Sequence, residues 1–386
     1  MKIGFDGKRA FQNKTGLGNY SRSLITSLAK TYPQHFYSLF TPTKTDLFDI
    51  KNLQNIQVNT PQKFIDKKFS SLWRRSRIVN DIKNNGIDIY HGLSNELPAG
   101  IENNAVKTVI SVHDLIFERY PDTYHFDEKF THRWKMKNSC KIADAVIATS
   151  QQTKKDLIEF YKIAEEKIFV CYQNCNPIFE NKIEDADKAI VKKRYQLPDQ
   201  YFLFVSSITQ RKNLIAVCKA LLVLKDKCNI PLVVIGDGKK EKEEVIQFLK
   251  TNQLQHRVYF LNDLPQSKEP GFVTSADFPA IYQQAFALIY PSYFEGFGIP
   301  LLEAMWSGLP VISSSSSCLP EVAGDAALYF SPDNIEALAG QMLQISLDKN
   351  LVENLQQKGF LQAQKFTALQ HAQQVMQVYE NLFTKL

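Results

Sequence analysis

The chain has 386 residues and a mass of 44.2 kDa, with 44% hydrophobic and 22% charged residues, 16 Gly and 16 Pro. This ordinary globular composition excludes disordered, collagen-like and disulfide-scaffold proteins, and the length is typical of two domains. The formal charge is +6, and the whole excess lies in residues 1–190, which hold 28 basic and 22 acidic side chains; an excess confined to one half indicates a partner for that half.

Short apolar runs alternate with amphipathic stretches along almost the whole chain. Strands are expected, in chain order, at Lys2–Asp6, Phe36–Phe40, Ile87–His91, Thr108–Val112, Ala145–Thr149, Tyr201–Ser206, Pro231–Gly236, Arg257–Phe260, Phe286–Tyr290 and Pro310–Ser313. Helices are expected between them, for example at Gly18–Leu28, Leu72–Lys83, Leu214–Leu224, Pro300–Ser307 and Ile335–Leu347. This alternation predicts an α/β protein with parallel sheets, and so many strands fit two doubly wound domains better than one sheet.

The polar stretch Asn181–Lys193 is the best candidate for a linker, because Tyr201 opens a fresh strand after it. We therefore expect a first domain over residues 1–185, a second over 186–365 and a final helix over 366–386. Ligands of open parallel sheets bind beyond the carboxyl ends of the strands, so a site is expected where a strand passes into a helix.

The six cysteines are scattered without a Cys-x-x-Cys pair, and the only Asp-x-Asp, Asp185-Ala186-Asp187, lies in the predicted linker. We therefore expect reduced thiols, no metal and no cofactor. The amino-terminal residues run straight into a strand, and no apolar run approaches the roughly 20 residues of a membrane span. A cytoplasmic protein is expected, with peripheral contact to a membrane left open.

Two features of the first half are ambiguous on their own. Thr15–Ser21 is glycine-rich, but about nine residues separate it from the preceding strand, where a dinucleotide-binding turn is tight. An NAD site is therefore not favoured. His113 leaves a strand in Ser111-Val112-His113-Asp114-Leu115, and such a lone histidine is more often structural than catalytic.

The segment Lys63–Arg77 carries much of the basic excess, interleaved with Phe64, Phe69 and Trp73. This pattern favours a helix lying on an anionic membrane about as much as an ordinary helix that buries Leu72 and keeps a solvated basic face. No recognisable nucleic-acid motif accompanies the charge, so nucleic acid is not expected as a partner.

Two strand–helix junctions of the second half carry the strongest signals. Arg211 and Lys212 follow a strand, and Asn213 is placed to cap the next helix; adjacent guanidinium and ammonium groups form a clamp for a diphosphate. In the second junction, the glycines of Glu295-Gly296-Phe297-Gly298-Ile299-Pro300 let backbone N–H groups approach a ligand at a helix N-terminus. Glu303 follows about one turn inside that helix, so two carboxylates are placed to bind hydroxyl groups.

The segment Glu295–Glu303 resembles the Glu-x7-Glu signature of the retaining GT-B glycosyltransferases, in particular glycosyltransferase family 4, which uses nucleotide sugars. The likeness continues through Asp277–Tyr282, Ala304–Ile312 and Leu319–Ala327. Arg211 and Lys212 match the family's pyrophosphate-binding pair. Ser206 stands where the family usually has glycine, and its Cβ is expected to narrow the approach of the donor there. The loop of Gly16 and Gly18 resembles the family's interdomain glycine loop, and His113 its sugar-contacting histidine.

The resemblance implies a GT-B architecture, with two Rossmann-like domains facing a central cleft and a C-terminal helix crossing back to the first. It implies that Arg211 and Lys212 neutralise a departing diphosphate, that Glu295 orients the donor sugar and that Glu303 holds the ribose, while His113 contacts the sugar. The implied donor-binding set is Gly16, Gly18, Ser206, Arg211, Lys212, Glu295, Gly296, Phe297, Gly298, Ile299 and Glu303.

The expected reaction is the retaining, metal-independent transfer of a hexose to a glycan or lipid-linked glycan in surface polysaccharide synthesis. Members of the family with a similar glycine loop are often mannosyltransferases, so GDP-mannose is the first expected donor and a UDP-sugar the second. A sugar-nucleotide epimerase or hydrolase, an NAD oxidoreductase and a non-catalytic binder are the alternatives. The basic first half then indicates an anionic acceptor, or an anionic membrane contacted through Lys63–Arg77.

Overall fold

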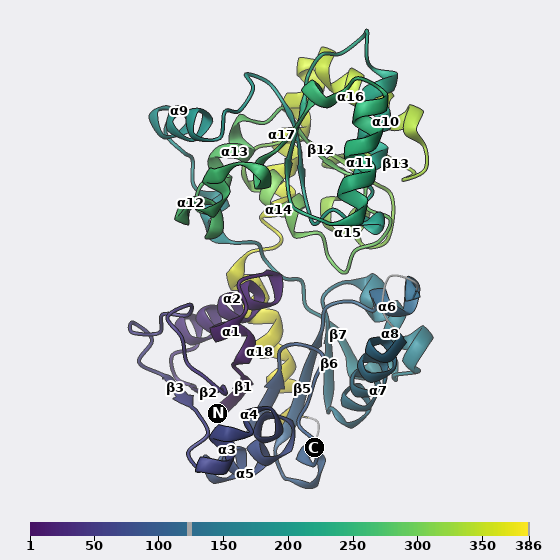
Figure 1. Cartoon of the computed structure of the whole chain (residues 1–386). Helices are drawn as coiled ribbons and strands as arrows, with labels where there is room; N and C mark the ends of the chain where they lie inside the picture. The colour runs from purple at the N-terminus through teal and green to yellow at the C-terminus, as the bar shows by residue number, and fades with distance from the viewer. Residues whose placement is uncertain (122–125, 385–386) are drawn as a thin grey trace. The chain divides into compact units, whose positions relative to one another are not determined.

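The computed structural model describes residues 1–121 and 126–384, with residues 126–131 described by their backbone alone. It divides the chain into two compact units (Figure 1). Unit 1 comprises Met1–Asn174 and Thr367–Leu386, and unit 2 comprises Cys175–Phe366. Each unit contains one parallel sheet, which confirms the predicted α/β class. Among the described residues, no helix is long and apolar enough to cross a membrane.

The sheet of unit 1 has the strand order β3-β2-β1-β4-β5-β6-β7. Its strands are β1 (Lys2–Asp6), β2 (Phe36–Phe40), β3 (Ile56–Asn59), β4 (Ile89–Gly92), β5 (Lys107–Val112), β6 (Ala145–Ala148) and β7 (Ile168–Val170). The chain builds outward from β1 on one side and then from β4 on the other. The junction of β1 and β4 is therefore the point at which the strand order reverses, where ligands of such sheets bind.

Helices cover both faces of this sheet. The apolar sides of α1 (Lys8–Gln12), α2 (Gly16–Thr31) and α18 (Ala368–Thr384) share one core, and Figure 1 shows the yellow α18 beside the purple α2. The other face carries α5 (Ile78–Asn84), α7 (Phe126–Ile142) and α8 (Gln151–Tyr161). Shorter helices are α3 (Phe64–Lys68), α4 (Ser70–Leu72), the π-helix η1 (Trp73–Arg77) and α6 (Ile116–Arg119).

The sheet of unit 2 has the order β10-β9-β8-β11-β12-β13, which reverses between β8 and β11. Its strands are β8 (Phe202–Val205), β9 (Leu232–Ile235), β10 (Val258–Phe260), β11 (Ala287–Tyr290), β12 (Val311–Ser314) and β13 (Ala327–Phe330). Its helices are α9 (Asp185–Arg194), α10 (Leu214–Val223), α11 (Lys240–Thr251), α12 (Pro270–Val273), α13 (Phe278–Gln284), α14 (Ile299–Trp306), α15 (Leu319–Ala323), α16 (Ile335–Leu347) and α17 (Lys349–Ala363).

The structure differs from the expected elements at the sheet edges and in two helical segments. The strands β3, β7 and β13 were not predicted; all three lie at edges, where one neighbour is missing and a continuous apolar run is not required. The predicted linker Asn181–Lys193 instead forms most of α9, a charged helix of unit 2 that buries only Val191. The predicted helix Leu72–Lys83 is interrupted by the π-turn η1.

Candidate active site

The two strongest sequence motifs meet where the strand order of unit 2 reverses. Arg211 and Lys212 follow β8 in a short 3-10 turn, and the loop from Pro291 to Gly298 follows β11, the strand beside β8. Because parallel strands end at the same edge of the sheet, both loops lie at the place where open α/β sheets bind ligands.

Glu295 lies between the two cations. Its carboxylate is 2.6 Å from Lys212 Nζ and 3.4 Å from Arg211 Nη1, and the three side chains are between 9% and 16% exposed. Arg211 also donates to the carbonyl of Phe294, and Lys212 Nζ lies 3.3 Å from the hydroxyl of Tyr290. Screening by water is weak at such a site, so these charges act strongly on one another and on any ligand.

Burial alone would raise the pKa of Glu295, but Lys212 and Arg211 beside it hold that pKa below its ordinary value. Glu295 is therefore ionised at neutral pH and accepts hydrogen bonds. Burial raises the pKa of Tyr290 well above its ordinary value, so its hydroxyl keeps its proton beside the charged pair. The cluster offers an anionic ligand two cations, and a hydroxylated ligand one fixed carboxylate.

Asn213, the residue after Lys212, links the loop after β8 to the loop after β11. We expected Asn213 to cap α10, but its side chain makes no capping bond. It adopts a left-handed conformation with φ of 57° and donates to the carbonyls of Pro291, at 3.3 Å, and Pro332, at 3.0 Å. Asparagine tolerates this conformation better than most residues, and its amide thereby fixes the loop after β8 against the loop after β11.

Gly298 precedes α14 with φ of +106°, a conformation that favours glycine. A Cβ atom there would lie 2.8 Å from the side chain of Leu319. Pro300 follows in the first turn of the helix, where its missing N–H costs nothing. The start of α14 is therefore shaped by the backbone of Gly298 and by Pro300 in the first turn.

Glu303 lies one turn inside α14, where its carboxylate accepts a hydrogen bond of 2.7 Å from the hydroxyl of Tyr282. Burial raises the pKa of Glu303 to about 7, and the bond from Tyr282 opposes this shift only in part. Glu303 thus changes its charge near neutral pH, unlike Glu295.

Sequence reasoning missed three residues that support these side chains. Tyr290 packs its ring 5.5 Å below Lys212 Nζ, Tyr282 engages Glu303, and Ser317 Oγ accepts a bond of 2.9 Å from the backbone N–H of Glu295. Tyr290 could have been found as the last residue of a strand that precedes the motif. Ser317, in the run of serines Ser313–Ser317, carried no such signal, because its position beside Glu295 depends on the pairing of β12 with β11.

Ser206 follows β8 directly, and its backbone carbonyl meets the turn after β9. A Cβ on Gly236 would lie 1.7 Å from that carbonyl oxygen, so the two loops approach each other as closely as a glycine allows. Ser206 itself donates its N–H to the carbonyl of Ile235 at 3.0 Å. Its place at the carboxyl edge of the sheet is shared with Arg211 and Lys212.

The remaining predicted residues lie in unit 1. His113 follows β5, and its Nε2 donates to the carbonyl of Leu93 at 2.9 Å, so Nδ1 carries the free lone pair. Burial lowers the pKa of His113, and the imidazole is neutral at pH 7. The ring of Tyr20 stands edge-on to it at 4.5 Å.

The glycine loop of unit 1 opens α2. Gly18 is required by a close approach, because a Cβ would lie 1.8 Å from the carbonyl oxygen of Asn13, whereas Gly16 has open space around it. The side chain of Asn13 accepts the backbone N–H groups of Thr15 and Gly18. The close approach of Asn13 thus requires a glycine at position 18. The loop joins α1 to α2, so it is not the tight strand-to-helix turn of a dinucleotide-binding site.

Each unit is thus a doubly wound, Rossmann-like domain, and unit 2 carries a basic pair and a carboxylate where its strand order reverses, which is where such sheets bind ligands. The family model described as "Glycosyltransferase Family 4" matches residues 14–173, and that described as "Glycosyl transferases group 1" matches residues 185–362. The two models together cover most of the chain. The chain therefore belongs to glycosyltransferase family 4 and is a glycosyltransferase.

Individual proteins are also similar. O-antigen chain mannosyltransferase B of Escherichia coli is 28% identical over 298 residues, which are 76% of this chain and 74% of that protein. The serotype-specific mannosyltransferase WbdA of Escherichia coli is 27% identical over 73% of this chain, which spans only 34% of that longer protein. The structure of Anabaena Alr3699/HepE in complex with UDP and glucose superposes with a TM-score of 0.73 at 17% identity, covering 99% of this chain and 100% of that one. The likeness to Anabaena Alr3699/HepE, at 17% identity, shows a shared fold alone.

Proposed function

We propose that this glycosyltransferase moves mannose from GDP-mannose to a hydroxyl group of a glycan or lipid-linked glycan in surface polysaccharide synthesis, with retention of configuration and without a metal. The observation that carries the proposal is the cluster of Arg211, Lys212 and Glu295 at the reversal point of the unit 2 sheet. The choice of mannose is supported by the relatives that are O-antigen and serotype-specific mannosyltransferases.

In the proposed reaction, the bond between the anomeric carbon and the diphosphate breaks, and a bond from that carbon to the acceptor oxygen forms. Arg211 and Lys212 stabilise the negative charge that develops on the leaving diphosphate, which is the part a divalent cation would otherwise take. Glu295 accepts hydrogen bonds from the sugar. We propose attack on the face that the diphosphate leaves, with the acceptor's proton passing to a phosphate oxygen.

A UDP-sugar is the second candidate donor. It is favoured by one observation, the structural likeness to Anabaena Alr3699/HepE, which was solved with UDP and glucose. Nothing in the cluster of Arg211, Lys212 and Glu295 discriminates between the two bases, because its charges act on the diphosphate and the sugar.

The test is a thermal-shift panel of GDP-, UDP- and ADP-sugars, followed by a transfer assay with an oligomannoside acceptor and EDTA. GDP-mannose is expected to raise Tm most, because only the folded state binds it, and NMR of the product is expected to show the α-anomer with full activity in EDTA. If a UDP-sugar raises Tm more than GDP-mannose does, the UDP-sugar is the donor instead. Loss of activity in EDTA that Mg²⁺ restores would refute metal independence, and a β-anomer would refute retention.

We also propose that Lys63–Arg77 contacts an anionic membrane. Phe64 is 82% exposed and Phe69 51% exposed, next to the exposed Lys67 and Lys68, which is the pairing of apolar and basic side chains that binds lipid surfaces. Trp73, which we expected to belong to this face, is instead buried and donates to Asp81 at 2.6 Å.

Sedimentation with vesicles tests this contact. Binding is expected to vesicles that contain phosphatidylglycerol and not to pure phosphatidylcholine, and the double variant Phe64→Ser/Phe69→Ser is expected to lose most of it, because about 1.5–3 kcal/mol of apolar burial is lost with each ring. Leu347→Ser, at a residue 75% exposed in unit 2, is the matched control. Binding that is indifferent to the anionic lipid would contradict the proposal.

A further inference from the structure

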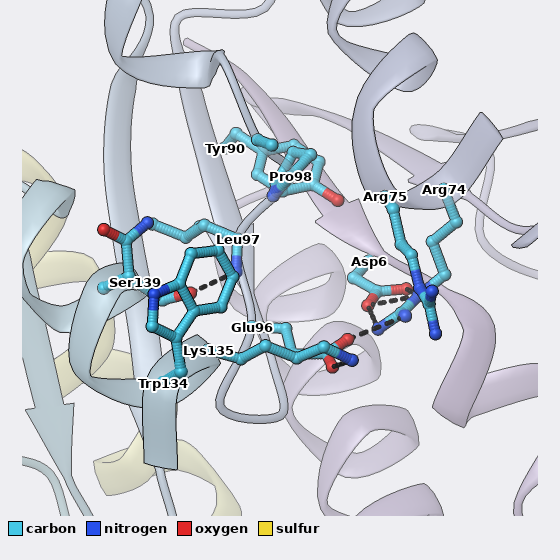
Figure 2. Close-up of a pocket in the computed structure, with 12 residues that line it drawn as sticks. Asp6, Arg74, Arg75, Tyr90, Glu96, Leu97, Pro98, Trp134, Lys135 and Ser139 are labelled. Carbon is cyan, nitrogen blue, oxygen red and sulfur yellow. Dashed lines mark hydrogen bonds and ion pairs between the residues drawn. The ribbon is translucent and has the colours of Figure 1, made fainter. Parts of the chain in front are cut away.

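Unit 1 contains a pocket with a volume of about 270 Å³. It lies between η1 and α7, beside the point where the strand order reverses from β1 to β4 (Figure 2). Its charged and aromatic lining includes Asp6, Arg74, Arg75, Glu96, Trp134 and Lys135. Asp6 ends β1 and Glu96 lies in the loop after β4, so the pocket adjoins the carboxyl edge of the sheet.

The charged groups of this pocket are fixed by one another. Arg74 reaches Asp6 at 2.5 Å through Nη2 and Glu96 at 2.8 Å through Nη1, and Lys135 reaches the other oxygen of Glu96 at 3.3 Å. Arg74 is 13% exposed and the Asp6 side chain 5%, so this is a built network rather than a set of surface charges. Asp6 also accepts the backbone N–H of Lys8 at 3.1 Å, so Glu96, at 29% exposed, is the carboxylate with more room for a further donor.

Arg74 and Arg75 both belong to the π-turn η1. The buried indole of Trp73 and its bond to Asp81 anchor the turn in the core, and Arg74 and Arg75 follow on the widened backbone. Such π-turns are rare and are often found at functional sites.

Trp134 is the unusual group on the other wall. It stands on α7 with 63% of its surface exposed, and Figure 2 shows Trp134 on the side of the pocket away from Arg74 and Arg75. An exposed indole is a flat apolar surface with one polar edge. The C–H face of a sugar ring stacks on such a surface, while its hydroxyl groups turn to charged and polar neighbours.

We infer that this pocket binds one neutral sugar residue of the acceptor glycan, stacked on Trp134 and hydrogen-bonded to Asp6, Glu96 and the neighbouring cations. The inference rests on the proposed function, transfer to a glycan. An anion such as a phosphate group fits less well, because it would face two carboxylates, and two of the three lining cations, Arg74 and Lys135, are already paired with them. Arg75 alone would be left to balance the charge of the anion. The volume is below the roughly 300–1,000 Å³ of pockets for drug-sized ligands, which suits a single ring.

Binding is tested without any donor. The protein labelled with 5-fluorotryptophan gives signals for its three tryptophans, and the Trp134 signal is assigned with Trp134→Phe. Mannobiose, maltose and diacetylchitobiose are the neutral probes, and pyrophosphate is the anionic one. At least one neutral disaccharide is expected to move the Trp134 signal saturably over the millimolar range, while pyrophosphate does not. A signal that follows pyrophosphate instead, or none of the probes, would overturn the inference.

The second arm is kinetic. Trp134→Ala is expected to raise the KM for the acceptor about tenfold, since a stacked ring loses most of its apolar contact, and to leave the KM for the donor and the melting temperature unchanged. Phe36→Ala is the matched control, because Phe36 is also 63% exposed but begins β2 at the opposite edge of the sheet. An unchanged acceptor KM in Trp134→Ala would also overturn the inference. If no transfer is seen with any donor, the proposed function fails. The titration of the Trp134 signal needs no donor, so it still shows whether the pocket binds a sugar.

Discussion

Arg211 and Lys212 are the residues on which the proposed chemistry depends most directly. Removing one cation from a weakly solvated site leaves the departing diphosphate less stabilised in the transition state, so Arg211→Ala and Lys212→Ala are each expected to lower kcat by about 100-fold. The measurement is steady-state transfer with the donor from the thermal-shift panel.

The control for both variants is Lys219→Ala, an exposed lysine on α10, which is expected to retain full kcat. Circular dichroism is expected to show that the variants stay folded, although Lys212→Ala leaves Glu295 with one partner fewer. Near-normal turnover in both Arg211→Ala and Lys212→Ala would refute the assignment of a diphosphate site.

Glu303 gives the site a pH dependence of predictable sign. Its pKa is raised from 4.5 to about 7, so the carboxylate becomes protonated as the pH falls through neutrality and then accepts fewer bonds from a ribose. If only the ionised form binds well, the donor nucleotide is expected to bind about tenfold more weakly at pH 6 than at pH 8.

Isothermal titration of GDP measures this change, and Glu303→Gln is the matched control. The glutamine keeps the shape of the side chain and does not titrate, so any dependence that remains in the variant belongs to the phosphates of GDP. Equal pH profiles for the wild type and Glu303→Gln would show that Glu303 does not take part.

At the scale of elements, the turn into α14 is fixed by its backbone. Gly298→Ala places a Cβ 2.8 Å from Leu319 in a left-handed conformation, and it is expected to lower the free energy of unfolding by about 1–3 kcal/mol. Gly340→Ala is the opposite case, because Gly340 lies inside α16 with nothing within 4 Å of an added Cβ. It is expected to stabilise the protein by about 0.5–1 kcal/mol.

Thermal or urea unfolding measures both changes, which differ in sign for the same chemical substitution. A Gly298→Ala variant as stable as the wild type would mean that the loop has other conformations open to it.

The sequence predicted every central strand of the two sheets and the edge strand β10, but not the edge strands β3, β7 and β13. Phe286–Tyr290 is a continuous apolar run and contains β11, whereas Ile87–His91, which contains most of β4, also carries Asp88 and His91. The edge strand β3 reads Ile-Gln-Val-Asn and is only half-buried, so its sequence carries no comparable signal. The helix α9 was interpreted as a linker because six of its ten side chains are charged, and in the structure only Val191 of this helix is buried.

The whole molecule depends on the return of α18 to unit 1. Ala372, Val375 and Met376 of α18 are at most 1% exposed in the core that also contains α2 and β1. Ending the chain at Phe366 exposes this core. At about 1.5–3 kcal/mol for each large buried side chain, the loss summed over the helix is comparable to the roughly 5–15 kcal/mol stability of a typical domain. Unit 1 is expected to unfold, whereas unit 2 keeps its own core.

Hydrogen exchange distinguishes the two units in the truncated chain. Peptides from β1 and α2 are expected to lose their protection while those from β8 and β11 keep it. Tyr379→Phe is the mild control; it removes the 2.6 Å bond to His91 and is expected to cost about 1–3 kcal/mol without unfolding the unit. Full protection of β1 after truncation would contradict this account.

The sequence by itself determined the α/β class, the paired parallel sheets and the family, because periodicity and the contiguous motif around Glu295 are local properties. The tertiary structure alone decided which groups meet. Lys212 and Glu295 are 83 residues apart, Asp6 and Arg74 are 68 apart, and Trp73 turned out to be buried rather than exposed. These contacts depend on the order in which distant strands pair. A local pattern gives only the spacing of apolar and polar side chains along an element, not what each side chain packs against.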